Sequence, residues 1–139
     1  MVEFTLTFIL LLIVAWIPAD FGLAFYTGQI AQNASREGAR IAAADKALVN
    51  ANCTMPCASA TAGSPLKAAA DRLSQALMPG ATIDISLDPN TAVCNRLVTV
   101  TVTGTYTFFF YKVLALMGGN VQPTANITRQ TSMRWEHQC

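Results

Sequence analysis

Phe4-Thr-Leu-Thr-Phe-Ile-Leu-Leu-Leu-Ile-Val-Ala-Trp-Ile17 is the stretch that decides the fold, and Phe21 to Tyr26 resumes it after Pro18-Ala19-Asp20. The first run spans only about 21 Å as a helix, whereas residues 2–26 span about 37 Å. Only the longer stretch can cross a hydrocarbon core of about 30 Å. The sequence therefore predicts a transmembrane helix over residues 1–26. Because proline removes a helical hydrogen bond, we expect Pro18 to kink this helix or to melt the turn around Ala15.

The composition separates this segment from the rest of the chain. Of the 139 residues, 53% are hydrophobic and only 12% are charged, compared with about 25% charged in an average soluble domain. Residues 1–35 contain two acids, Glu3 and Asp20, and no lysine or arginine. A net charge of +1 without a basic run argues against nucleic-acid binding. One histidine and scattered acids give no catalytic or metal-ligating constellation, so we expect neither an enzyme nor a cofactor.

The helix is expected to continue through residues 27–51, which are rich in good helix formers. Small residues recur here every four positions and form two adjacent rows along the helix, which allow close approach of another helix or of the chain's own domain. The rows are Ala31, Ser35, Ala39 and Ala43, and Ala34, Gly38 and Ala42. A helix reaching about Val49 would be about 70 Å long. Such a helix needs lipid or other helices around it, because a 14.9 kDa chain cannot bury it alone.

Residues 52–139 are expected to form an exported α+β domain. Ser64-Pro65 begins a short helix, and Thr82 to Leu87 alternates in polarity as a strand does. Residues 98–107 alternate valine with threonine, and residues 124–137 give a weaker third strand. The fold class is therefore α+β, with a long N-terminal helix packed on a small antiparallel sheet. The very apolar connection 108–117 is expected to pack in the core, to cover the upper part of the long helix, to dip into the membrane or to contact another subunit.

The four cysteines indicate an oxidising compartment, since all lie beyond the apolar segment. Zinc binding is the alternative, but Cys94 and Cys139 are isolated, so disulfides are favoured over a metal site. If Thr107 lies opposite about Ile127, Cys94 comes next to Cys139 at one end of two strands. Cys53 and Cys57 then close a small loop around Pro56. The competing map joins Cys53 and Cys57 to Cys94 and Cys139 in either order.

Three motifs in order resemble a known family. They are Val2-Glu3-Phe4 before the apolar run, Asp20-Phe21-Gly22 with an aromatic pair after it, and Asn33-Ala-Ser-Arg-Glu-Gly-Ala-Arg40. This pattern resembles the TadE-like pilins and pseudopilins of bacterial tight-adherence (Tad) pili, a branch of the type IV pili. Residues 98–102 and the ending Met133-Arg-Trp-Glu136 agree with it more loosely.

The resemblance implies a structural subunit of a cell-surface filament that serves adhesion or surface attachment. Its implied partners are copies of itself or related pilins in a helical filament, the inner membrane before assembly, a prepilin peptidase and the pilus assembly machinery. Family members carry a basic leader and a glutamate at the fifth mature position, whereas glutamate is third here. Either the leader and two mature residues lie outside this chain, or its processing differs. The residues expected to take part in assembly are Glu3, Phe4, Pro18, Asp20, Gly22, Gly28, Ser35, Gly38 and Ala39.

Two of these residues carry their own physical argument. A carboxylate at Glu3 inside an apolar helix costs about 2.5–3.5 kcal/mol, which pairing with the N-terminal amine of a neighbouring subunit would offset. The alternative is that the Glu3 carboxylate lies at the level of the lipid headgroups, hydrated and unpaired. Asp20 is expected to cap the helix that restarts after Pro18, or to contact another subunit. The rival functions are a single-pass membrane-anchored binding domain that forms no filaments and a tethered enzyme.

Overall fold

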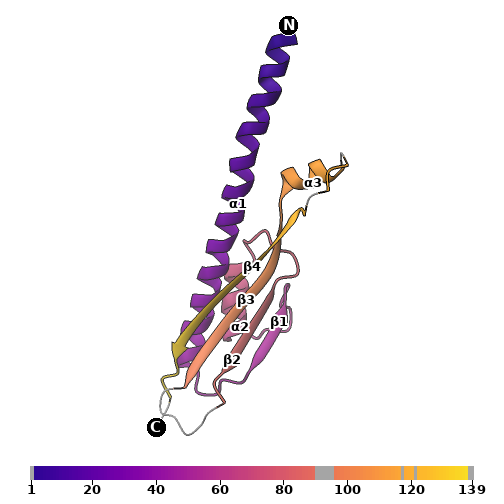
Figure 1. Ribbon diagram of the computed structural model, residues 1–139. Coiled ribbons are helices and arrows are strands. Elements are labelled where there is room, and N and C mark those ends of the chain that lie inside the picture. The colour runs from indigo at the N-terminus through magenta and orange to yellow at the C-terminus, as the bar shows by residue number, and fades with distance from the viewer. Residues whose placement is uncertain (1, 90–95, 117, 121, 138–139) are drawn as a thin grey trace.

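The computed structural model describes residues 2–89, 96–116, 118–120 and 122–137. Its elements, in chain order, are α1 (Val2–Ala44), β1 (Ala51–Thr54), α2 (Pro65–Leu73), β2 (Thr82–Leu87), β3 (Leu97–Thr107), α3 (Phe109–Leu116) and β4 (Thr124–Arg134). Figure 1 shows α1 running most of the length of the molecule, with the sheet beside its C-terminal half and its N-terminal half extending clear of the strands. The predicted α+β fold, a long N-terminal helix packed on a small antiparallel sheet, is confirmed.

Helix α1 is continuous through Pro18. The melted turn expected around Ala15 is therefore wrong. Proline removes one backbone hydrogen bond, whereas opening a whole turn would remove several more from a segment that has no other partners for them. A proline inside an apolar helix is tolerated for this reason.

Helix α1 ends at Ala44, before the boundary predicted at residue 51. The other end of the chain supplies the reason. The backbone N–H of Glu136 donates to the carbonyl oxygen of Ala43 at 3.0 Å, and the indole N–H of Trp135 donates to the carbonyl oxygen of Asp45 at 2.8 Å. These donors satisfy carbonyl groups that helix ends leave without partners, so the helix gains little from a further turn.

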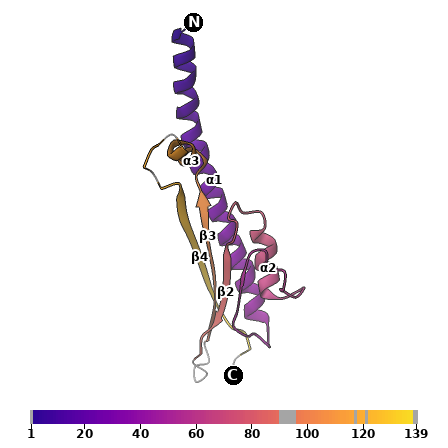
Figure 2. The same ribbon diagram turned by 90° about the vertical axis from the view of Figure 1, so that its right-hand side faces the viewer.

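The four strands form one antiparallel sheet in the order β1-β2-β3-β4. Figure 2, which views the sheet closer to its edge, shows α1 and α2 on the same side of it. The buried face of the sheet carries Ile83 and Ile85 from β2, and Val98, Val100 and Val102 from β3, all at most 2% exposed. Alternation predicted these residues and their orientation, because successive side chains of a strand point to opposite faces.

The core between the sheet and the helices is built from small helical residues and branched strand residues. Ala31, Ala34, Ala39, Ala42 and Ala69 are fully buried against the strands. Alanine on the helices brings their backbones close to the sheet, and the valines and isoleucines of the sheet fill the remaining space. The hydrophobic stabilisation therefore comes mainly from the strand side chains, at about 1.5–3 kcal/mol for each large one.

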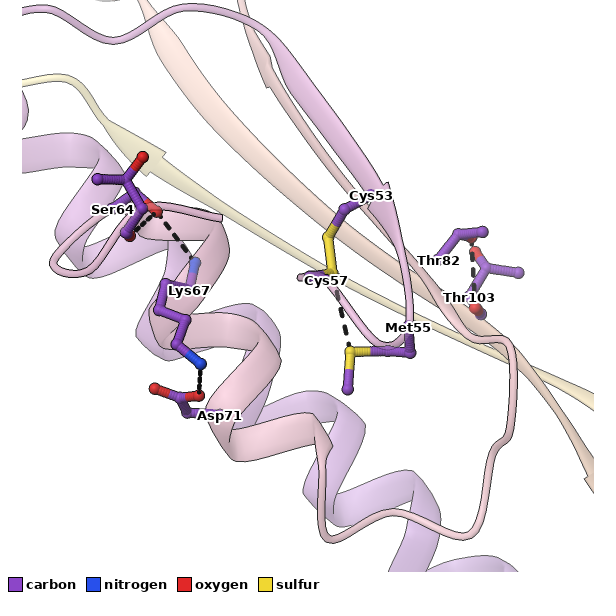
Figure 3. Close-up of a disulfide and its surroundings, with 9 residues drawn as sticks. Cys53, Met55, Cys57, Ser64, Lys67, Asp71, Thr82 and Thr103 are labelled. Atoms are coloured by element: carbon purple, nitrogen blue, oxygen red, sulfur yellow. Dashed lines mark hydrogen bonds and ion pairs between the residues drawn. A yellow bond between two sulfur atoms is a disulfide. The ribbon is translucent and has the colours of Figure 1, made fainter. Parts of the chain in front are cut away.

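Strand β1 lies in a segment for which the sequence predicted no strand. Its four residues are too few to show alternation, and it forms by pairing with β2, with Cys53 opposite Ile83. Just beyond it, a disulfide joins Cys53 to Cys57 across a Cα–Cα distance of 5.6 Å, as predicted (Figure 3). The sulfur of Met55 lies 3.8 Å from the sulfur of Cys57 on the same loop.

Helix α2 begins as predicted. The Ser64 hydroxyl accepts a hydrogen bond from the backbone N–H of Lys67, and Pro65 occupies the first helical position. Lys67 and Asp71 then pair along the exposed side of the helix at 2.7 Å (Figure 3). The helix ends at Leu73, where turns lead to β2.

The register of β3 against β4 differs from the prediction by three residues. Thr107 lies opposite Thr124 rather than near Ile127, and Val98 lies opposite Met133. The expected register supposed that Thr107 pairs with about Ile127 across the apolar connection, without fixing the conformation of that connection, which contains the separate helix α3. Cys94 and Cys139 lie outside the described residues, so their pairing stays a prediction.

Candidate functional site

The first part of the candidate site is the bare segment, defined as residues 2–19 of α1. Every residue in it is exposed. Phe4, Leu6 and Leu11 each leave more than 60% of their surface open. Helix α1 is long and apolar enough to cross a membrane. Since a buried core helix would be covered by its own domain, these features suggest that this end of the chain anchors in a membrane.

Glu3 lies in the bare segment, one turn before Thr7, whose hydroxyl donates to the Glu3 carbonyl oxygen at 2.8 Å. Among the described residues, no side chain pairs with the Glu3 carboxylate. Phe4 stacks on Phe8 at a ring-centroid distance of 6.4 Å and is otherwise open. Gly22, farther along, is also open, since a Cβ there would meet nothing within 4 Å. These residues are free to meet lipid or another copy of the chain.

Asp20 marks the junction between the bare segment and the domain. It is only 4% exposed. One carboxylate oxygen accepts from the Tyr106 hydroxyl at 3.0 Å, and the other accepts from the backbone N–H of Phe110 at 2.9 Å. The expectation that Asp20 caps its own helix is wrong, because α1 needs no restart and the carboxylate serves the first turn of α3 instead.

This arrangement changes the acidity of the tyrosine. Burial raises the pKa of Tyr106 to about 12, and both its hydrogen bond to Asp20 and the negative charge of Asp20 act in the same direction. The phenol is therefore held protonated and donating. Tyr106 thus joins the end of β3 to α1 at the point where α1 leaves the domain.

The two rows of small residues face the chain's own domain. A Cβ on Gly38 would lie 3.1 Å from the Cβ of Ala69 and 3.3 Å from Val100. Ala39 is fully buried. The close approach that these rows allow is therefore used inside the subunit, against α2 and the sheet, and they are not available to a neighbouring helix in this structure.

Two further predicted assembly residues, Ser35 and Gly28, also contact β4. The Ser35 hydroxyl lies 2.8 Å from the Thr131 hydroxyl, and the Gln32 amide donates to that same Thr131 oxygen at 3.1 Å. Gly28 lies under the guanidinium of Arg129, where a Cβ would come within 3.3 Å. These contacts fix α1 along the last strand, so both residues have an intramolecular role here.

The opposite face of the sheet is open and polar. One exposed row crosses all four strands and consists of Thr54, Thr82, Thr103 and Thr128. Hydroxyl-bearing neighbours extend this pattern, and Thr99 and Ser132 lie 3.0 Å apart between their side-chain oxygens. This face is suited to solvent, whereas the bare segment is not.

The remaining chemistry of the described residues is sparse. In the part of the chain that the structure describes, no three histidine, cysteine or acidic residues gather where they could hold a metal ion. A surface groove of about 530 Å³ between α1, α2 and β4 carries Arg36, Arg40 and Arg72, and Glu37 pairs with Arg40 at 2.8 Å beside it. That groove is shallow and contains one acid, with no candidate nucleophile arranged beside a base.

The chain thus combines an exposed apolar helix, a buried polar junction and a polar outer face. Comparison with known proteins gives a match to one family model. Residues 1–40 match the TadE-like protein family. The match includes the bare segment, the Asp20 junction and most of the two rows of small residues, and it leaves the sheet outside. It supports a protein associated with Tad pili. Comparisons with curated proteins and with solved structures gave no significant match.

Sequence reasoning missed Tyr106 and α3 as parts of the site. Tyr106 has a visible signal, because it continues the buried positions of β3 after Val98, Val100 and Val102, where a phenol needs a buried partner. Its partner, Asp20, is 86 residues away. The same distant carboxylate accepts the backbone N–H of Phe110 in the first turn of α3, a contact that no local pattern predicts.

Proposed function

We propose that this chain is a structural, non-enzymatic pilin-like subunit that assembles through α1 into a Tad-type pilus. In this proposal it is anchored in the bacterial inner membrane first and becomes part of an extracellular filament later. Copies of itself or related pilins, a prepilin peptidase and the pilus assembly machinery are its expected partners. The observation that carries the proposal is the bare segment, in which every residue is exposed although most of the side chains are apolar.

The size of the exposed surface supports assembly. Burying a large apolar side chain contributes about 1.5–3 kcal/mol, and the bare segment leaves many of them open, among them Phe4, Leu10 and Val14. Lipid covers such a surface before assembly, and the helices of neighbouring subunits cover it in a filament. The same apolar surface therefore contacts lipid before assembly and other subunits after it.

Glu3 makes the replacement of lipid by the helix of a neighbouring subunit specific. Its carboxylate is costly in lipid, at about 2.5–3.5 kcal/mol. An ion pair at about 4 Å contributes roughly 4 kcal/mol at an effective dielectric of 20, enough to offset that cost when a neighbour presents an amine. None of the described residues of this chain places a cation beside Glu3, so the proposed amine belongs to a neighbouring subunit.

The open sheet face completes the proposal. With α1 inside a filament, the threonine-rich face opposite α1 would point outward. Its polar groups keep the filament soluble and are the natural place for contacts in adhesion or surface attachment. Mostly hydroxyl and amide side chains line this face.

The test is the composition of sheared surface material. Electron microscopy with an antibody to the exported domain should label fibres along their length. We predict that Glu3→Ala leaves the domain folded and the chain in the membrane, and strongly reduces the yield of fibres. The matched control is Glu136→Ala, which removes an exposed acid at the far end of α1.

Normal fibre yield from Glu3→Ala would remove the pairing role of Glu3 and leave assembly itself standing. Abundant membrane-bound chain with no labelled fibres under conditions where the pilus is made would instead favour the alternative, a membrane-anchored extracytoplasmic binding domain that forms no filaments.

A further inference from the structure

Helix α3 is held at a defined position along the axis of α1, beside residues 16–21. The ring of Phe109 stacks on Trp16 at a centroid distance of 5.6 Å, and Phe108 lies 5.4 Å from Phe21. Asp20 accepts the backbone N–H of Phe110 between these two contacts. Figures 1 and 2 both show α3 beside α1, above the region that the sheet covers. The position of α3 along α1 is therefore fixed by three separate interactions.

The position of α3 along α1 can be compared with the length of helix that crosses a membrane. About 20 helical residues cross a hydrocarbon core of about 30 Å. The apolar stretch expected to cross the membrane ends at residue 26, and Trp16 and Phe21 both lie within it, with Trp16 about 15 Å of helix from that end. A helix that stacks on Trp16 must then lie at the membrane boundary or below it. It follows that α3 and the bare segment cannot be in different environments.

We infer that α3 is an interfacial helix that inserts into the exported-side leaflet of the membrane that α1 crosses. The inference rests on the membrane-anchored stage of the proposed function and needs no filament. Its partner is a lipid surface, and the subunit would thus contact the membrane at two places. Interfacial helices of this kind lie in the plane of the headgroups with their apolar side chains inserted.

The side chains of α3 suit this place. Its sequence, Phe-Phe-Tyr-Lys-Val-Leu-Ala-Leu, contains aromatic residues and a single charge. Phe109 is 57% exposed and Leu116 is 89% exposed, which in water would leave a large apolar patch next to the bare segment. The exposed Lys112 has a side chain long enough to reach phosphate groups from below.

A groove between the two helices offers a place for an acyl chain. It has a volume of about 230 Å³ and is lined only by apolar side chains, from Leu12, Ile13, Trp16, Phe109 and Phe110. Three of its five lining residues belong to α1, the proposed membrane-crossing helix, so lipid would already surround its rim. A second subunit is the other conceivable cover, and the test below separates the two.

The test uses single-tryptophan variants of the full chain in phosphatidylcholine vesicles. The reporter variant is Phe109→Trp with Trp16→Phe and Trp135→Phe, which keeps an aromatic pair between the helices. Lipids brominated near the carboxyl end of the acyl chain quench shallow tryptophans, and lipids brominated near the methyl end quench deep ones. A second reporter places the tryptophan at the exposed Leu116 in the same background, in case the exchange at residue 109 disturbs packing.

We expect both reporters to lose emission with the shallow bromines and to lose less with the deep ones. Trp16 alone, in Trp135→Phe, should be quenched and so report the anchor. Trp135 alone, in Trp16→Phe, should keep its emission because it lies at the other end of α1. Quenched Trp16 with two unquenched reporters would overturn the interfacial role of α3 and leave the anchor standing. Unquenched Trp16 would overturn both the anchor and this inference. Neither result depends on whether fibres form.

Discussion

Most of the large apolar residues of α1 lie in its N-terminal half and are exposed, whereas the residues that its C-terminal half buries are mostly alanine, with glycine, serine, threonine and the single large residue Ile30. Leu11 is 63% exposed, and Ala31, Ala34 and Ala39 are completely buried. Within one continuous helix, the more hydrophobic half is therefore the less buried one. The usual link between apolar character and burial is reversed because the sheet and α2 cover the second half, whereas the first half is contacted mainly by α3 and the chain leading into it.

The difference teaches what each half is built to contact. Small residues are useful where the contacting surface is fixed and close, as it is where Gly38 meets Ala69 and Val100. Large apolar residues are useful where the helix contacts fluid lipid or the helix of another subunit. Asp20 is the first buried residue along α1 and marks the change from one half to the other.

The largest expected effect comes from placing the same residue in both halves. Gly38→Leu would overpack the contact with Ala69 and Val100, and we expect it to lower the free energy of unfolding by about 3 kcal/mol. Gly22→Leu is the matched control and should leave stability unchanged, since nothing lies within 4 Å of its Cβ position. Urea unfolding in detergent micelles, followed by Trp135 fluorescence in a Trp16→Phe background, measures both. Equal effects of the two changes would refute the division of α1.

The second prediction concerns the junction. The unfolded pKa of tyrosine is about 10, and burial with the Asp20 contact raises the pKa of Tyr106 to about 12. The stabilisation is therefore complete below pH 10 and is lost as pH rises through the folded pKa. At about 1.4 kcal/mol per pKa unit, the expected loss is on the order of 2 kcal/mol. The difference in the free energy of unfolding between the wild-type chain and Tyr106→Phe, measured from pH 8 to 12, separates the contribution of Tyr106 from that of the other tyrosines. A difference that stays constant over this range would contradict the prediction.

The smallest effect tests the polar contact of the buried half. Thr131→Val removes the hydroxyl that meets Ser35 and Gln32, and we expect a loss of about 1 kcal/mol, the usual net contribution of such bonds. Thr128→Val, on the open face of the same strand, is the control. The same unfolding measurement applies. A larger loss from the control would mean that β4 is held mainly through its outer face.

The elements with strong local patterns were predictable from the sequence. Valine–threonine alternation predicted β3, and Ser64-Pro65 predicted the start of α2. The weaker predictions failed where distant residues decide the outcome. Strand β1 exists because β2 is available to pair with it, and α1 ends where Trp135 and Glu136 supply donors.

The candidate site divides in the same way. The exposed apolar helix could be predicted from its own segment, and the assembly role of Glu3 stays a prediction. The roles of Asp20 and Gly38 could not, because each is set by partners far along the chain, Tyr106 for the first and Ala69 for the second. The rows of small residues predicted close packing correctly and left open what packs there.

The most direct test of the central claim is photo-crosslinking from the bare segment in sheared fibres. A benzophenone amino acid at Leu10, which is 59% exposed, should give an adduct that contains a second copy of the chain or a related pilin, because the bare segments are proposed to meet in the filament. The same probe in membranes from cells that make no fibres should give only lipid adducts. Fibres in which the Leu10 probe reacts with the exported domain of its own chain, or with no other subunit, would contradict the account.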